Sequence, residues 1–220
     1  DPGLAAIFAN TIPEISQVND IISIHCVATD VAQLSLTING EVVATAEANE
    51  LKYDYTVPAE GDYTFTFTAT KGEETKIVSE QTCVVSAPVQ QVRPKSVDMG
   101  IYYHSPAAGE SLGSVTLSTY AASKTEAAKH VFVVGDFNNW AISNKYQMKQ
   151  DGNYFWLEID GLETKKEYAF QYVVVRADGI TKKISDLYSE KVLHPDDQYE
   201  PKTVNPDLMD YPKGGEGYVS

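Results

Sequence analysis

Long apolar segments and basic residues are both scarce in this chain of 220 residues. No apolar run approaches the ~18 residues of a membrane-spanning helix, so we expect no membrane span. The sequence contains 17 Lys and Arg and 31 Asp and Glu, which gives a formal net charge of −14. Proteins that bind nucleic acids carry basic patches. This balance therefore argues against a nucleic-acid partner, and it leaves uncharged ligands such as sugars open.

Cysteine and histidine are also rare, with 2 and 4 copies. No CxxC or Cys/His spacing indicates zinc, and no HExxH or Ser/His/Asp order is present. His194 with Asp196 and Asp197 is interpreted as a turn in a proline-rich segment. We therefore predict no metal, no cofactor and no catalytic residue. Cys26 and Cys83 leave two interpretations open, a disulfide between them or, the favoured one, two separate buried thiols.

Sustained helical periodicity is absent, and short strand patterns fill the first part of the chain. Residues 62–70 (DYTFTFTAT) alternate apolar side chains with threonines, which is typical of a half-buried strand. Asn39-Gly40, between two apolar segments of residues 34–45, predicts a hairpin. Further strands are expected at 21–28 and 76–87. About six strands in some ninety residues predict a small immunoglobulin-like sandwich.

A second series of strands follows a polar segment that contains Pro88 and Pro94, which we interpret as a linker. Turns at Asp151-Gly152 and Asp178-Gly179 punctuate this series, and no helical stretch interrupts it. The predicted strands are 100–105, 114–121, 130–137, 153–160 and 167–175. The predicted fold class is all-β, with two immunoglobulin-like antiparallel β-sandwiches in tandem. The predicted domains are a sandwich at 1–88, a linker at 89–96, a second sandwich at 97–190 and an extended tail at 191–220.

The stretch HVFVVGDFNNW, residues 130–140, ends a predicted strand in two amides and a tryptophan. A pyranose exposes a face of C–H groups that packs on an aromatic ring, while amides offer both donors and acceptors to sugar hydroxyls. Trp140 beside Asn138 and Asn139 therefore has the chemistry of a sugar subsite. The alternative, favoured slightly, is that Phe137 and Trp140 fold back as a plug of the core while the amides cap the turn.

Four segments of the second half together resemble carbohydrate-binding module family 48, the isoamylase N-terminal type. They are VFVVGDFNNW (131–140), MKQDGNYFWLEIDGL (148–162), YAFQYVV (168–174) and SDLYSEKVLHP (185–195). In addition, PAEGDYTF (58–65) resembles the corner of immunoglobulin-like domains at which a tyrosine ties a connection to the sandwich.

The family resemblance implies the non-catalytic N-terminal region of an exported α-amylase-type enzyme of glycoside hydrolase family 13. Such a region supports the catalytic domain of the same polypeptide and has α-glucan (starch, glycogen or maltooligosaccharide) as its ligand. The first residues, DPGLAAIFAN, lack the basic and apolar regions of a signal peptide, so we expect none within this sequence. A periplasmic, cell-surface or extracellular location is expected. The alternative function is a stand-alone glycan-binding or scaffold protein of a polysaccharide-utilisation system.

The resemblance and the strand pattern name two further candidate contacts. Gln171 aligns with a lysine used by glycogen-binding members, and its amide is still able to bond to hydroxyls. Those members carry a second tryptophan after the Asp-Gly turn, where this chain has Ile180. Trp156 falls on the more polar face of its strand and is interpreted as an exposed platform or, preferably, as a side chain covered by the tail or a neighbouring domain. Tyrosines of the last segment are expected to form an interface: Tyr188, Tyr199, Tyr211 and Tyr218.

Overall fold

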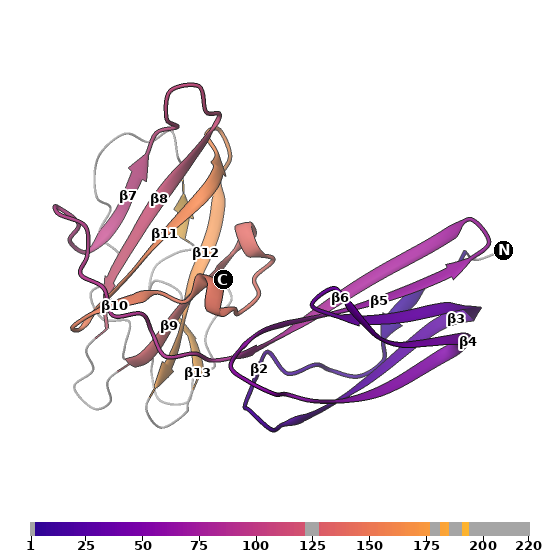
Figure 1. Cartoon of the computed structure of the whole chain (residues 1–220). Coiled ribbons are helices and arrows are strands. Elements are labelled where there is room, and N and C mark those ends of the chain that lie inside the picture. The colour runs from indigo at the N-terminus through magenta and orange to yellow at the C-terminus, as the bar shows by residue number, and fades with distance from the viewer. Residues whose placement is uncertain (1–2, 122–127, 177–180, 185–190, 194–220) are drawn as a thin grey trace. The chain divides into compact units, whose positions relative to one another are not determined.

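A computed structural model describes residues 3–121, 128–176, 181–184 and 191–193 (Figure 1). Within these residues the secondary structure consists of β-strands and two short 3-10 helices, so the predicted all-β fold class is confirmed. The chain forms two compact units, unit 1 (Asp1–Ser86) and unit 2 (Ala87–Ser220), each with its own hydrophobic core. None of the helices found there is long and apolar enough to cross a membrane.

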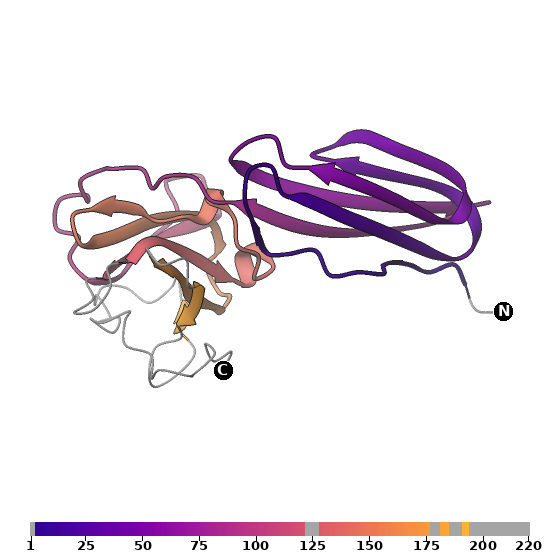
Figure 2. The same cartoon turned by 90° about the horizontal axis from the view of Figure 1, so that it is seen from below.

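Unit 1 is built from one six-stranded sheet. Its strands are β1 (Ala6–Phe8), β2 (Ile15–Ser16), β3 (Ile21–Ile38), β4 (Glu41–Thr56), β5 (Gly61–Lys71) and β6 (Glu74–Val84). The order of neighbours is β1-β3-β5-β6-β2, and β4 pairs with β3. β2 runs parallel to β6, and the other pairings are antiparallel. Figure 2 shows the longer strands of this unit, drawn in indigo to purple, lying along one another.

Ring contacts show that this sheet folds over on itself into a sandwich. Tyr55 pairs with Ile22 of β3, whereas Phe65 pairs with Ile38 at the other end of the same strand. A flat strand would separate Ile22 from Ile38 by about 50 Å. The rings of Tyr55 and Phe65 nevertheless lie 6.0 Å apart. The two ends of β3 therefore contribute to opposite layers around one core.

Two local signals of the sequence are found in unit 1 as predicted. Asn39 (φ 50°) and Gly40 (φ 81°) are both left-handed, as a type I′ turn requires, and they join β3 to β4. The Tyr63 hydroxyl donates to the Ala59 carbonyl at 2.7 Å, which ties the entry of β5 to the preceding connection. The turn and the Tyr63–Ala59 hydrogen bond each involve residues close together in the sequence, which is why short sequence patterns predict them.

Of the two interpretations of the cysteines, the structure confirms two separate buried thiols and excludes the disulfide. Cys26 and Cys83 are both buried, and no disulfide joins them. Cys26 on β3 pairs with Leu51, while Cys83 on β6 pairs with Asp62. Burial raises the pKa of the Cys26 thiol to about 11. This thiol therefore stays protonated and unreactive at neutral pH.

Unit 2 is a sandwich of two four-stranded sheets around one core. The first sheet has the order β10 (Lys149–Asp151), β11 (Tyr154–Glu163), β8 (Leu112–Tyr120) and β7 (Gly100–His104). In the second sheet β12 (Tyr168–Arg176) pairs with β9 (Ala128–Gly135), β13 (Thr181–Ile184) and β14 (Lys191–Leu193). Leu117 and Phe155 of the first sheet share a core with Val133 and Phe170 of the second. The predicted tail lies outside the described residues, except for β14.

The segment expected as a linker is partly ordered on unit 2. Gln90 forms a parallel bridge with Gln150 of β10. The Gln91 amide donates to the Gln150 carbonyl at 3.0 Å, and the Gln150 amide donates to the Val89 carbonyl at 2.8 Å. We call residues 89–93 the strap. These bonds use only backbone groups, so the polar side chains of the segment do not reveal them.

Candidate functional site

Gly135, the last residue of β9, allows the loop that follows to pack closely against β12. A Cβ at this position would lie 2.5 Å from the Ala169 carbonyl oxygen and 2.8 Å from Cε1 of Phe137, so only glycine fits. A 3-10 helix, η1 (Asp136–Asn138), follows directly. The chain then reverses through Asn139 (φ 54°) and Trp140 (φ 57°), both left-handed. This reversal brings the end of the loop back over its start.

Asn138 is committed to the turn. Its Oδ1 accepts from the Gly135 amide at 2.9 Å, and its Nδ2 donates to the Val133 carbonyl at 2.9 Å. The Asn138 side chain thus links the end of β9 to η1, and both its oxygen and its nitrogen are used in these bonds. Asn139, in contrast, is exposed. The structure therefore separates the two amides, one holding the loop and the other facing solvent.

Trp140 is held by polar contacts on two sides. A left-handed conformation costs a non-glycine residue roughly 1–2 kcal/mol, so the surrounding bonds must maintain it. The Trp140 amide donates to the Gly135 carbonyl at 3.0 Å, and the indole Nε1–H donates to Oδ1 of Asp136 at 3.0 Å. The side chain is half-buried, with part of its surface open to solvent. Trp140 is thus a fixed aromatic ring at the surface of unit 2.

Phe137, in the same loop, is a partly buried side chain that packs against the core of unit 2. Its ring lies 5.5 Å from that of Tyr146, in the second 3-10 helix, η2 (Asn144–Tyr146). Phe137 therefore packs the loop against the core, while Trp140 is held by hydrogen bonds within the loop. The plug interpretation fits Phe137 and does not describe Trp140.

Gln171 lies in the interior of unit 2. It is on β12, pairs with Val134 of β9, and is 2% exposed. A buried amide has no access to a ligand at the surface unless the neighbouring strands move. The contact that the family resemblance implies for Gln171 is therefore not available in this structure. Ile180 lies outside the described residues.

Trp156 is covered as well, and the described residues that contact it include Gln91 of the strap and Lys149 of β10. It is 4% exposed, and its indole Nε1–H donates to the Gln91 carbonyl of the strap at 2.9 Å. The Nζ of Lys149 lies 4.6 Å from its ring centroid, in the range of a cation–π contact. The platform interpretation of Trp156 is corrected accordingly, because the strap and Lys149 occupy the space that a sugar would need.

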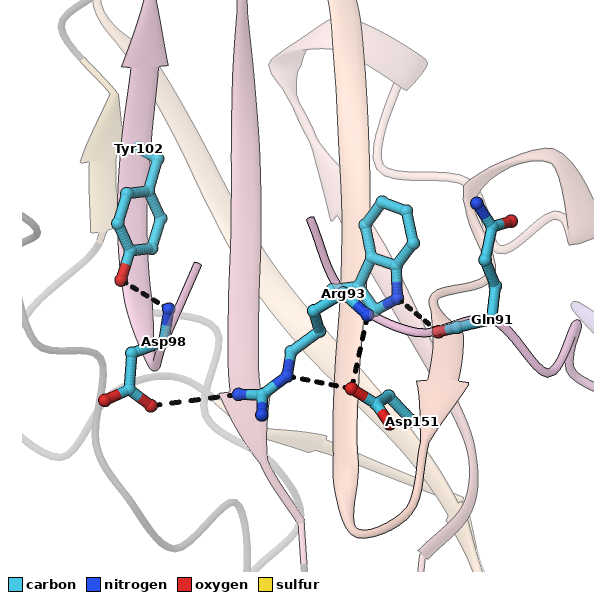
Figure 3. A network of polar contacts seen from close by, with 6 residues as sticks. Gln91, Arg93, Asp98, Tyr102 and Asp151 are labelled. Atoms are coloured by element: carbon cyan, nitrogen blue, oxygen red, sulfur yellow. Dashed lines mark hydrogen bonds and ion pairs between the residues drawn. The ribbon is translucent and has the colours of Figure 1, made fainter. Parts of the chain in front are cut away.

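Arg93 fastens the strap over this face of the first sheet (Figure 3). Its backbone amide and its Nε donate to Oδ2 of Asp151 at 3.2 and 3.1 Å. Its guanidinium lies 3.6 Å from the ring centroid of Tyr154, and one terminal nitrogen is 3.7 Å from Asp98. The backbone bond from Arg93, and next its guanidinium, lower the pKa of Asp151. Asp98 in turn donates its amide to the hydroxyl of Tyr102 at 2.7 Å.

The described residues contain no group of three or more His, Cys, Asp or Glu side chains placed to hold a metal ion. His194, Asp196 and Asp197 lie outside the described residues. The candidate site is therefore the loop Asp136–Trp140, with Trp140 and Asn139 as its accessible groups. Asp136, whose carboxylate accepts the indole N–H of Trp140, was not among the residues predicted from the sequence.

Comparison with known families bears on unit 2. Residues 100–189 match the family model of carbohydrate-binding module 48 (isoamylase N-terminal domain). The matched range includes the loop Asp136–Trp140, and the match supports a carbohydrate-binding function for this region. No curated protein matches the sequence.

Several solved structures are similar at low identity. The fibronectin(III)-like modules of Clostridium thermocellum CbhA are 11% identical, with a TM-score of 0.34 over 96% of this chain and 100% of that one. Bacteroides uniformis β-glucuronidase 3 is 12% identical, with a TM-score of 0.30 over 84% of this chain and 24% of that one. Parabacteroides merdae β-glucuronidase is 10% identical, with a TM-score of 0.30 over 88% of this chain and 25% of that one. The chain thus spans about a quarter of each β-glucuronidase.

Proposed function

We propose that unit 2 binds α-glucan through the loop Asp136–Trp140. One observation carries the proposal: Trp140 is fixed at the surface in a left-handed conformation, within the region that matches a carbohydrate-binding family. A ring fixed in this way offers a rigid apolar face to the C–H face of a glucose unit. Asn139, exposed beside it, supplies both a donor and an acceptor for the hydroxyls.

The site is small, and this limits the affinity that we expect. Asn138, Gln171 and Trp156 are occupied or buried, so of the five candidate residues only the ring of Trp140 and the amide of Asn139 remain for the ligand. A single stacked sugar with few hydrogen bonds corresponds to a dissociation constant on the order of 1 mM, or about −4 kcal/mol. Such weak binding suits a module that concentrates its substrate rather than one that selects it.

In the wider proposal, this chain is the non-catalytic N-terminal part of an exported α-amylase-type glycosidase of family 13, in which it also supports the catalytic domain. The sequence resemblance favours this assignment, since SDLYSEKVLHP resembles the segment that precedes the catalytic barrel in such enzymes. The alternative is a stand-alone glycan-binding or scaffold protein. The parent gene decides between them: a barrel encoded after Ser220 supports the first, and its absence supports the second.

Calorimetric titration of the chain with maltoheptaose tests the binding itself. We expect saturable heat with a dissociation constant in the millimolar range, and its loss in Trp140→Ala. Trp156→Phe is the matched control, because it changes a buried indole and leaves the loop untouched. Absence of heat with the unmodified chain, or binding by Trp140→Ala equal to it, would contradict the proposal and leave support of a catalytic domain as the better function.

A further inference from the structure

Asp136 connects the candidate site to the frame of unit 2. Its Oδ1 accepts the indole Nε1–H of Trp140 at 3.0 Å, while its Oδ2 accepts the Ala169 amide at 2.8 Å. Ala169 lies on β12, which pairs with three other strands of its sheet. A single carboxylate thus links the tip of a surface side chain to the backbone of a central strand.

We propose that Asp136 is a positioning residue that fixes the angle of the Trp140 indole, so that the ring is oriented for a sugar before the sugar arrives. The proposal rests on the proposed function and adds to it the group that sets the geometry of the platform. The Trp140 backbone is already fixed by its bond to the Gly135 carbonyl. The bond from Nε1 to Asp136 restrains the other end of the side chain, which leaves the indole little freedom to rotate.

The location of the bond favours orientation over stability as its role. Asp136 is exposed, and hydrogen bonds between exposed side chains contribute little to folding because water competes for both partners. A preset ring, in contrast, avoids the entropy that a mobile side chain loses when a ligand immobilises it. Side chains whose rotamers are fixed by neighbouring groups make the more accurate binding sites.

The same bond also limits what the platform offers. Because the indole N–H is donated to Asp136, the platform presents only its ring to the ligand and no donor of its own. The hydroxyls of a stacked sugar must then be met by other groups, of which Asn139 is the exposed amide in the loop. We therefore expect the site to recognise the apolar face of a pyranose. Its affinity should depend little on the charge of the sugar or on the length of the glucan chain.

The test compares Asp136→Ala and Asp136→Asn with the unmodified chain, by hydrogen exchange of the indole N–H groups in 15N spectra and by calorimetry with maltoheptaose. For Asp136→Ala we expect exchange of the Trp140 indole to rise at least tenfold and affinity to fall about tenfold, with exchange at Trp156 unchanged. Asp136→Asn keeps one acceptor oxygen, so intermediate values are expected. Asp160→Ala, which removes an exposed carboxylate from β11, is the control for charge.

Unchanged exchange at Trp140 in Asp136→Ala, or unchanged affinity, would overturn the positioning role. Faster exchange at both tryptophans would overturn it too, because this result would show a general loosening of unit 2. Absence of binding by the unmodified chain would instead contradict the proposed function, and the exchange rates would still decide whether Asp136 fixes the indole.

Discussion

The two tryptophans of this chain lie in the same unit and have opposite relations to solvent. Trp140 is half-buried in a loop, and its indole N–H is bonded to an exposed carboxylate. Trp156 is 4% exposed, and its indole N–H is bonded to a backbone carbonyl of the strap. Both have polar neighbours in the sequence. The difference shows that the covering segment, rather than the local pattern, decides which aromatic ring is able to serve as a platform.

Truncation of the covered tryptophan is expected to have the largest effect. Trp156→Ala removes a buried indole and should destabilise unit 2 by about 3–5 kcal/mol. Urea unfolding followed by tryptophan fluorescence measures this, and both tryptophans of the chain lie in unit 2. Trp140→Ala should cost less than about 1 kcal/mol, as is usual for surface substitutions. Equal losses of unfolding free energy in Trp156→Ala and Trp140→Ala would contradict the division into a covered and an accessible tryptophan.

Gly135→Ala tests whether the frame of the loop determines the site. The added methyl would collide with the Ala169 carbonyl, so we expect a loss of about 1–3 kcal/mol and weaker binding of maltoheptaose. Gly161→Ala is the control, because Gly161 (φ 74°) has open space around it and its substitution introduces backbone strain alone. Binding that survives in Gly135→Ala as well as in Gly161→Ala would show that the site tolerates movement of the loop.

The adjacent amides allow a sharper comparison within the loop. Asn138→Ala leaves the Gly135 amide and the Val133 carbonyl without their partner, which should cost about 1–3 kcal/mol. Asn139→Gly keeps the left-handed conformation at no steric cost, so stability should hold while affinity falls. The reverse pattern, with stability lost at Asn139 and binding lost at Asn138, would contradict the division of roles between the two residues.

The smallest effect is expected at the strap and depends on pH. The bonds from Arg93 lower the pKa of Asp151 below its ordinary value of about 4. Their stabilising contribution is therefore present above that value and is lost as the pH falls through the lowered pKa. In the background Trp140→Phe, acrylamide quenching of Trp156 should rise as the pH drops below about 4. With Asp151→Asn added to this background, quenching should already be higher at neutral pH and should not rise further as the pH drops. If the pH profiles with and without Asp151→Asn were identical, the Arg93–Asp151 pair would be excluded as the cause of the pH dependence.

The sequence predicted features whose cause is local. Asn39-Gly40 specifies its turn by itself, and the alternation around Phe65 specifies a strand, so both could be predicted from a few residues. The covering of Trp156 depends on Gln91, which lies 65 residues earlier and contributes a backbone carbonyl. No side-chain pattern encodes such a bond. Gln171 was expected to contact the ligand, but β12 is buried along most of its length, so the alternation of its residues does not tell which of them reaches the surface.

The loop itself shows a second limit of prediction. The letters Asn138-Asn139-Trp140 indicate the chemistry of sugar binding, yet they do not say which amide turns inward. Asn138 turns inward because its amide bonds to the Gly135 amide and the Val133 carbonyl, two backbone groups of β9. Only the assembled sheet reveals that Asp136 holds Trp140 and Ala169 together.

One titration tests the comparison most directly, because the chain has only two indole N–H groups. In 15N spectra recorded with increasing maltoheptaose, the Trp140 indole signal should shift and saturate at millimolar concentrations while the Trp156 signal stays in place. Movement of the Trp156 signal alone, or of neither signal, would contradict the assignment of Trp140 as the sugar platform of this protein.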